Sequence, residues 1–176
     1  MNYYAVQVKT REEGRFASLA EKMRAGDPLS VVYPRRVLSV RRRGKVSPKE
    51  EPLYPGYVFL AGGEIPTEVY WRIKKVPGFR RFLKSNRDIR PVEGRDREIL
   101  LHFLGFGEVI RKSTVRFDAD DRIQVLEGPL LGLEGRIVKI DKRKGRAKVR
   151  LDMYEESFLV DLGMDFIGKI GENPNG

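Results

Sequence analysis

Residues 122–151 constrain the fold most, because apolar and charged residues alternate there in three short runs separated by glycines. In the last run, Val149 and Leu151 alternate with Lys148 and Arg150. Successive side chains of a strand point to opposite faces of a sheet, so the apolar set predicts a buried face and the charged set an outer one. We therefore expect a small β-barrel with one charged wall.

Positive charge is concentrated on that wall. Residues 136–150 contain eight Lys or Arg and one acid, whereas residues 151–176 contain one Lys and six acids. The whole chain has a net charge of +10, and residues 1–105 carry 22 basic and 12 acidic side chains. Separated cationic clusters fit the phosphates of a nucleic acid, although a solvated face that aids solubility is the alternative for any single cluster.

Composition and spacing disfavour several other classes. No apolar run is as long as a membrane-spanning helix, so we expect a cytoplasmic protein that makes no membrane contact. The chain has no cysteine, which excludes disulfides and thiolate metal sites. The only histidine, His102, lies in an apolar helical segment, and the acids at 118, 120 and 121 lack the spacing of a calcium loop. We predict no catalytic residue, no metal and no cofactor, and hence a protein that is not an enzyme.

Strand and helix patterns alternate over the first 105 residues. Residues 3–9 alternate like a strand, and Thr10 stands three residues before Glu13, the spacing of a capping box that would begin a helix. Seven basic residues surround Gly44 in residues 35–52, which predicts an extended, mobile hairpin whose tip can lie on a polyanion.

The remaining patterns complete an α+β fold. Thr67 is a candidate cap for a helix over 68–75. Residues 94–104 predict a third helix with Ile99, Leu100 and Phe103 facing inward. This order indicates helices against a largely antiparallel sheet. The predicted organisation is a domain over 1–105, a linker over 106–118 that lets the two parts move independently, and a barrel domain over 119–171.

Several segments resemble the NusG family of transcription elongation factors. They are the aromatics of the first strand, PGYVF at 55–59, VPGFRRFL at 76–83 and EGPLLGLEGRIVKID at 127–141. The resemblance covers nearly the whole chain. It implies a NusG-type α/β sandwich joined to a KOW β-barrel, in a monomeric binding factor. The C-terminal half is most similar to the LoaP subgroup, whose members carry out processive antitermination.

The resemblance implies a polymerase-binding patch. In the family, the N-terminal domain docks on the clamp of RNA polymerase core through exposed apolar side chains, and aromatic rings are favoured at the centres of interfaces. We expect Tyr54, beside Pro55, to be exposed. The alternative is that Tyr57 and Phe59 simply fill the core. The implied polymerase-binding residues are Tyr4, Tyr54, Tyr57, Phe59, Thr67 and Tyr70.

The resemblance also implies nucleic-acid contacts. LoaP proteins are recruited by an RNA hairpin in the nascent leader transcript through a basic KOW surface, and the RfaH branch reads the non-template DNA strand. For Arg11 and Arg15 a solvated helix face is an equal alternative. The implied RNA-binding residues are Arg136, Lys139, Lys142, Arg143, Lys144, Arg146, Lys148 and Arg150, and the implied DNA contacts are Arg11, Arg15, Lys74 and Lys75.

Two alternative functions stay open. One is a general NusG-type elongation factor that couples polymerase to the termination factor Rho or to the small ribosomal subunit. The other is a KOW protein that binds RNA or the ribosome without polymerase. A general KOW domain contacts Rho or the ribosome through an apolar loop, but here Glu155, Glu156 and Ser157 make the corresponding loop acidic, which disfavours both partners.

Overall fold

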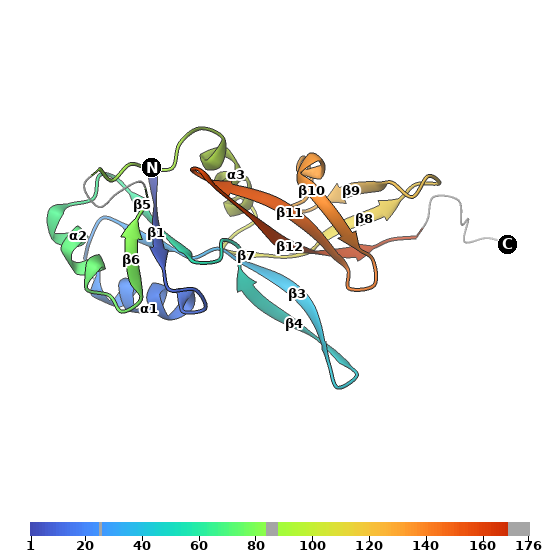
Figure 1. Ribbon diagram of the computed structural model, residues 1–176, viewed down its shortest axis with the longest axis horizontal. Helices are drawn as coiled ribbons and strands as arrows, with labels where there is room; N and C mark the ends of the chain where they lie inside the picture. The colour runs from blue at the N-terminus through green and yellow to red at the C-terminus, as the bar shows by residue number, and fades with distance from the viewer. Residues whose placement is uncertain (25, 84–87, 169–176) are drawn as a thin grey trace.

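The structure is a computed structural model that describes residues 1–24, 26–83 and 88–168. It is elongated, with a helix-covered sheet at one end, a second sheet at the other, and a hairpin that projects sideways between them (Figure 1). In the described ranges, no helix has the length and apolar character needed to cross a membrane.

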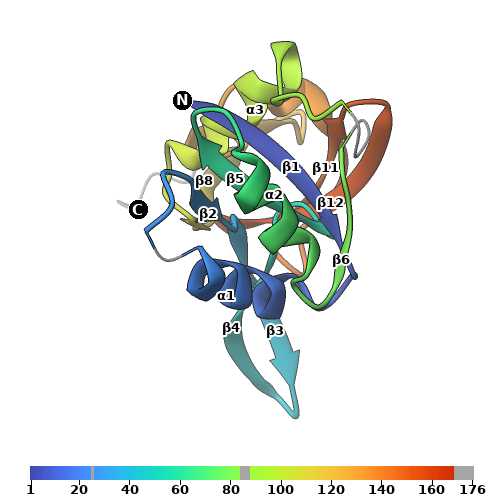
Figure 2. The ribbon, with the colours of Figure 1, turned by 90° about the vertical axis from the view of Figure 1, so that its left-hand side faces the viewer.

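The N-terminal sheet has the strand order β2-β5-β1-β6, and every neighbouring pair is antiparallel. Helices α1 and α2 cover one face (Figure 2). Tyr4 and Val6 face these helices, whereas Ala5 and its cross-strand neighbour Phe59 face the other way. The predicted packing of helices on an antiparallel sheet is confirmed. The elements are β1 (Asn2–Val8), α1 (Glu13–Met23), β2 (Ser30–Val32), β5 (Tyr57–Gly62), α2 (Thr67–Lys74) and β6 (Phe79–Phe82).

Helix α1 begins near the predicted position but without the predicted capping box. No side-chain cap forms at its first turn. Glu13 is only 2% exposed, and its carboxylate accepts a hydrogen bond from the backbone N–H of Gly56 at 2.8 Å. The capping box is wrong because Glu13 reaches across to the turn before β5 instead of back to Thr10.

The second sheet has the order β10-β11-β12-β8-β9. Strand β12 pairs antiparallel with β11 and parallel with β8. The predicted alternation in β11 is confirmed, because Ala147, Val149, Leu151 and Met153 are all fully buried. The elements are β8 (Ser113–Phe117), β9 (Ile123–Glu127), the 3-10 turn η1 (Glu134–Arg136), β10 (Ile137–Asp141), β11 (Arg146–Met153) and β12 (Glu156–Phe166).

The predicted hairpin is confirmed as β3 (Arg35–Arg42) and β4 (Lys45–Pro52), paired in antiparallel register along their full length. Its two turn residues, Arg43 and Gly44, both have positive φ, which is the geometry of a tight hairpin turn. The base of β3 pairs in parallel with β7 (Val109–Ile110) and packs against β12, so the hairpin is anchored at one end and projects at the other (Figure 1).

Gly163 of β12 permits this packing. A Cβ atom on Gly163 would lie 2.8 Å from the Val37 carbonyl oxygen, which is backbone of β3. We expect Gly163→Ala to push the hairpin away and cost about 1–3 kcal/mol of unfolding free energy, or about 2–12 °C in Tm. Thermal denaturation measures this. The matched control is Gly135→Ala, whose added methyl meets nothing within 4 Å; equal Tm values for the two variants would contradict the close approach.

Helix α3 (Gly94–Leu104) has the predicted bounds, and Ile99, Leu100 and Phe103 are buried as expected. The predicted linker over 106–118, by contrast, holds β7 and β8, and β8 belongs to the second sheet. Sequence periodicity missed these strands because they are only two and five residues long. The last residues of the predicted barrel domain, 169–171, lie outside the described ranges.

One apolar cluster joins the two halves of the chain. It contains Tyr57 and Phe59 of β5 together with Leu151 and Met153 of β11. In this arrangement the two halves are packed together, and their independent movement stays a prediction. The contact was missed because its apolar surface comes from the strands of the two sheets, not from the segment that connects them.

Candidate functional site

Three rings of the implied polymerase-binding patch lie together on the helix-free face of the N-terminal sheet. Tyr54, Tyr57 and Phe59 are 1%, 3% and 0% exposed. Phe158 of β12 packs on them, with its ring centroid 5.8 Å from that of Tyr54 and 6.1 Å from that of Tyr57. We call Tyr54, Tyr57 and Phe59 the aromatic cluster, and Phe158 covers it. The expectation that Tyr54 is exposed is wrong, because its ring lies between Phe59 and Phe158.

The turn before β5 sets the cluster's geometry. Gly56 has φ near +84°, and the Tyr57 N–H donates to the Tyr54 carbonyl at 3.0 Å, so two aromatic residues follow each other closely around the turn. Strand alternation then puts Tyr57 and Phe59 on one face. Tyr4 packs on the opposite face, among residues that meet α1 and α2, so it does not lie with these three rings. Its polymerase-binding role stays a prediction.

Polar contacts close over the cluster. The Tyr57 hydroxyl donates to the Glu156 carboxylate, and Arg81 forms an ion pair with the same carboxylate at 3.3 Å. The Tyr154 hydroxyl donates to the Arg90 carbonyl at 3.0 Å. Burial and then the bond to Glu156 raise the pKa of Tyr57, and burial beside acidic side chains raises the pKa of Tyr154 to about 12. Glu156 of the acidic loop therefore takes part in the contact between the two halves of the chain.

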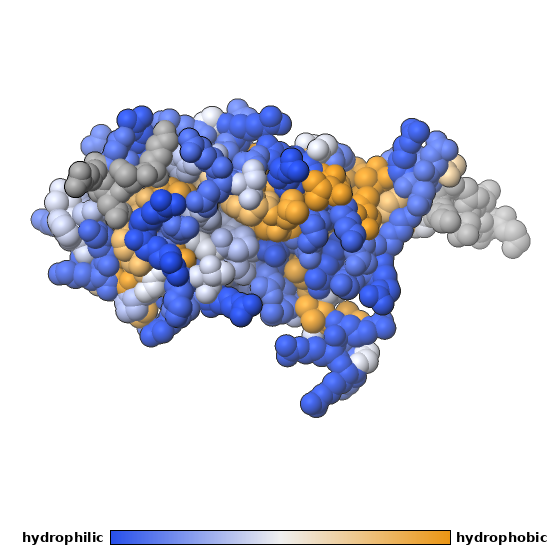
Figure 3. Space-filling model, viewed as in Figure 1, coloured by the Kyte–Doolittle hydropathy of each residue, from blue (hydrophilic) through white to orange (hydrophobic). Residues whose placement is uncertain are grey.

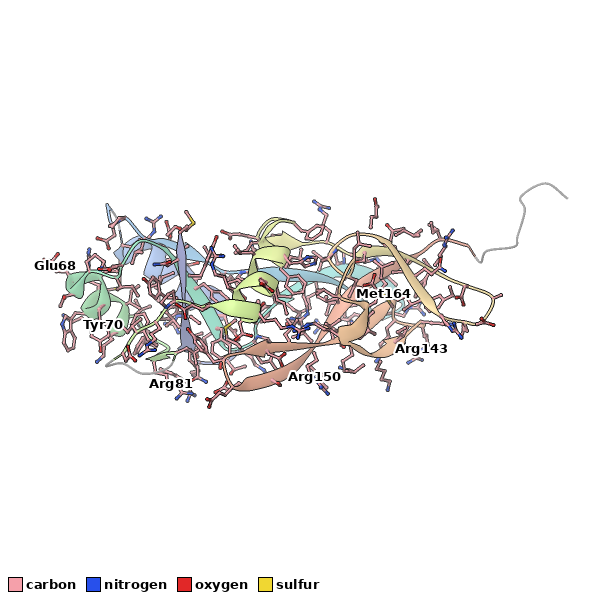
Figure 4. All side chains as sticks on the ribbon, turned by 90° about the horizontal axis from the view of Figure 1, so that it is seen from above. Glu68, Tyr70, Arg81, Arg143, Arg150 and Met164 are labelled. Carbon is pink, nitrogen blue, oxygen red and sulfur yellow. The ribbon has the colours of Figure 1, made fainter. Side chains whose placement is uncertain are left out.

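Thr67 and Tyr70 belong to α2. Tyr70 lies at the far end of the molecule from Arg143 (Figure 4). Thr67 is exposed. Tyr70 stacks on Phe82 with ring centroids 5.5 Å apart. Trp71 is 53% exposed beside them, and the Lys74 ammonium lies 4.8 Å from its ring centroid. Sequence reasoning missed Trp71, although a lone tryptophan on the polar side of a helix was a usable signal.

The candidate DNA contacts lie on the two helices of the N-terminal half and the segments that flank them. Arg11 and Arg15 are exposed, and neither forms an ion pair with another described residue. Lys74 and Lys75 occur at the end of α2, where Lys74 contacts the rings of Tyr70 and Trp71. Both solvation and nucleic-acid contact fit these positions.

Most of the eight implied RNA-binding residues have acidic partners. Arg136 pairs with Asp152 at 3.0 Å, Lys148 and Arg146 pair with Asp161 at 2.8 and 3.5 Å, Lys144 lies 3.8 Å from Asp141, and Lys142 pairs with Asp121. Lys139, Arg143 and Arg150 are exposed and have no ion pair within the described part of the chain.

Two of the paired acids, Asp152 and Asp161, have a lowered pKa. Hydrogen bonds from Ser157 and Arg136 lower the pKa of Asp152. Burial opposes ionisation of Asp161, but the hydrogen bond from Lys148 and the charge of Arg146 outweigh it, so its pKa is also lowered. The outer face of β11 is thus less positive than the run of basic residues suggests, because strand pairing brings acids of β12 beside it.

The hairpin carries a second group of unpaired cations. They are exposed, they have no ion pair with any described residue, and they surround the turn. The free end of the hairpin is accordingly hydrophilic (Figure 3). We call these residues the hairpin tip: Arg41, Arg42, Arg43 and Lys45.

His102 has a structural contact. Its Nε2–H donates to the Pro129 carbonyl at 2.8 Å, and its ring meets those of Phe103 and Phe106 edge-on. Over the described ranges, no group of three His, Asp or Glu side chains is arranged to hold a metal ion.

Comparison with known proteins identifies the family. The family model described as "Transcription termination factor nusG" matches residues 1–101. The chain is 26% identical to the transcription termination/antitermination protein NusG of Borreliella burgdorferi over 96% of this chain and 98% of the relative. It is 20% identical to the protein of the same description from Helicobacter pylori strain J99, over 97% and 99%.

A solved structure has the same fold. It is described as "Domain interaction in Thermotoga maritima NusG", with a TM-score of 0.58 and 23% identity over 92% of this chain and 93% of that one. Members of the matched family are transcription factors. The family model covers more than half of the chain, and this chain therefore belongs to the NusG family.

Proposed function

We propose that this protein binds RNA polymerase core through the aromatic cluster and promotes processive antitermination, with its C-terminal half acting as a KOW barrel that holds an RNA hairpin of the leader transcript. The relatives named termination/antitermination proteins support the general role. The LoaP-like part of the proposal is supported by the cations of the C-terminal half that lack acidic partners.

The main support for the polymerase contact is the way in which Phe158 covers the aromatic cluster. Phe158 belongs to β12, which is about a hundred residues away from Tyr57 in sequence. The Tyr57 hydroxyl also bonds to Glu156 of β12. The contact between the two sheets consists of Phe158, the buried side chains of Leu151 and Met153, and a few polar bonds. Such a contact between two parts of one chain can be exchanged for a contact with another protein. Separation of the sheets would leave an apolar aromatic face of the type found at interface centres.

The hydroxyl of Tyr54 supports such an exchange. It is buried and has no hydrogen-bond partner within the described ranges. An unsatisfied buried hydroxyl costs about 1–3 kcal/mol. A partner that offers an acceptor to Tyr54 would recover this free energy when it replaces Phe158.

Substitution of Tyr57 tests the docking role. We expect Tyr57→Ala to weaken binding to RNA polymerase core about tenfold, since truncating a central interface aromatic costs about 1–2 kcal/mol or more. Binding of purified protein to immobilised core enzyme measures it. Tyr33→Ala is the matched control, because Tyr33 is a partly buried aromatic that packs with the helix-facing core instead. Equal binding by both variants would contradict docking through the cluster.

A further inference from the structure

A groove of about 400 Å³ lies where the β3–β4 hairpin meets the β10–β11 turn. One wall carries Arg41 and Val46 of the hairpin, and the other carries Arg143, Lys144 and Arg146 of the C-terminal half. The two walls are about a hundred residues apart in sequence, so neither half contains this groove by itself.

The charge of the groove is positive and partly uncompensated. Lys144 and Arg146 have acidic partners, but Arg41 and Arg143 form no ion pair with any described residue. The hairpin tip continues the positive charge beyond the groove. A line of cations that extends from a groove along a projecting turn suits a polyanion more than a single small anion.

The spacing of the two walls is fixed by contacts at their base. Arg146 donates from Nη2 to the Ser39 carbonyl at 2.8 Å while it pairs with Asp161. The absence of a side chain at Gly163 lets β3 pack against β12. Arg146 is therefore a positioning residue that joins the walls, and Arg41 and Arg143 are the cations left available to a ligand.

The groove also has an apolar part. Val46 is 57% exposed at its hairpin wall, next to the unpaired Arg41. A nucleic-acid strand presents phosphates for the guanidinium groups and sugar and base surface for the valine. An acidic peptide offers carboxylates but no comparable flat apolar surface beside each charge.

We propose that this groove binds the phosphodiester backbone of one nucleic-acid strand between the hairpin and the β10–β11 turn. The inference deepens the proposed RNA-binding role, and it adds the N-terminal hairpin to a site otherwise assigned to the C-terminal half alone. Arg41 contacts the strand from one side and Arg143 from the other.

The test is binding of a labelled single-stranded RNA to the full chain at several salt concentrations, followed by fluorescence anisotropy. Arg41→Ala/Arg143→Ala should weaken binding about tenfold and reduce the salt slope by about 1.4, or about 0.7 for each lost phosphate contact. The control is Arg95→Ala/Arg122→Ala, which removes the same charge from exposed positions outside the groove. The control should leave the slope nearly unchanged.

Three further arms separate the possible results. A DNA strand of the same sequence shows whether the groove prefers RNA or DNA. Binding of either strand at the groove supports the inference. Loss of affinity equal to that of the control, or displacement of RNA by poly-glutamate at equal charge, would overturn it. Lys139→Ala/Lys148→Ala/Arg150→Ala tests the outer face of the C-terminal sheet: if only this triple weakens RNA binding, the groove fails while the proposed RNA role stands.

Discussion

Phe158→Asp should increase the affinity of the protein for RNA polymerase core about a hundredfold. Phe158 contacts Tyr54 and Tyr57 directly, and a carboxylate in its place would lie against apolar rings and near Glu156. Removing the ring contacts of the partly buried Phe158 and placing a carboxylate there costs about 3 kcal/mol. In the closed arrangement the docking face is hidden, so only the open fraction of the protein can bind polymerase. Weakening the closed arrangement by about 3 kcal/mol raises the open fraction, and with it the apparent affinity, about a hundredfold.

Leu159→Asp provides the matched control. Leu159 is the next residue of β12, it is 51% exposed, and it points to the opposite face of the strand. Both variants add one negative charge to the same strand, but only Phe158→Asp disturbs the aromatic cluster. Titration of each variant with core enzyme, together with hydrogen exchange at β5, measures docking and opening. Equal affinities for polymerase in the two variants would show that the cluster's cover does not limit binding.

The same variant connects the two proposed sites. If the hairpin stays with the N-terminal half when the sheets separate and uncover Tyr57, the contacts of β3 with β12 break and the β10–β11 turn moves away from the hairpin. Arg41 and Arg143 then no longer form two walls of one groove. Nucleic-acid binding in the groove and exposure of the aromatic face are therefore expected to oppose each other. By linkage, nucleic acid should weaken the affinity for polymerase by the same factor by which polymerase weakens the affinity for nucleic acid.

The spacing of apolar residues in the sequence predicted a helix or strand well where the same spacing continues over the whole element. Helix α3 has the predicted bounds, and β11 has the predicted buried and outer faces, because one side-chain period covers each element completely. The hairpin was also predicted, since polar residues around Gly44 leave an antiparallel turn as the simplest conformation.

Long-range contacts were beyond the reach of the same patterns. Alternation in β5 shows that Tyr57 and Phe59 share a face, but not whether Phe158 or a partner protein covers that face. The run of basic residues likewise predicts a cationic wall, yet Lys148 and Arg146 meet Asp161 only because of the register between β11 and β12. Pairing across strands depends on the assembled sheet, which a single segment does not encode.

Glu13 illustrates how a correct element can be predicted for the wrong physical reason. Its position near the start of α1 suggested a cap, but its carboxylate instead accepts the Gly56 N–H at 2.8 Å in a buried setting. The bond ties the first turn of α1 to the turn from which Tyr57 begins β5. The side chain is thus a link between the helical layer and the aromatic face.

Replacement of this carboxylate should have the largest effect on stability of the changes considered. We expect Glu13→Ala to lower the free energy of unfolding by about 3 kcal/mol, because hydrogen bonds to charged groups contribute about 1.5–3 kcal/mol and the Gly56 N–H would stay buried without an acceptor. For a domain of this size the Tm should fall by about 6–12 °C. Thermal and urea denaturation at neutral pH measure both quantities.

Two companion variants show which interaction is responsible. Glu13→Gln keeps an acceptor oxygen at the same distance from the backbone and should recover about half of the lost stability, since a neutral acceptor forms a weaker bond than a carboxylate. Glu12→Ala removes the neighbouring carboxylate, which is more exposed and pairs with Lys9 at the surface, and should change the Tm by about 1 °C or less. A Tm for Glu13→Ala as high as that for Glu12→Ala would mean that the bond to Gly56 does not hold the turn, and the aromatic face would then need another anchor.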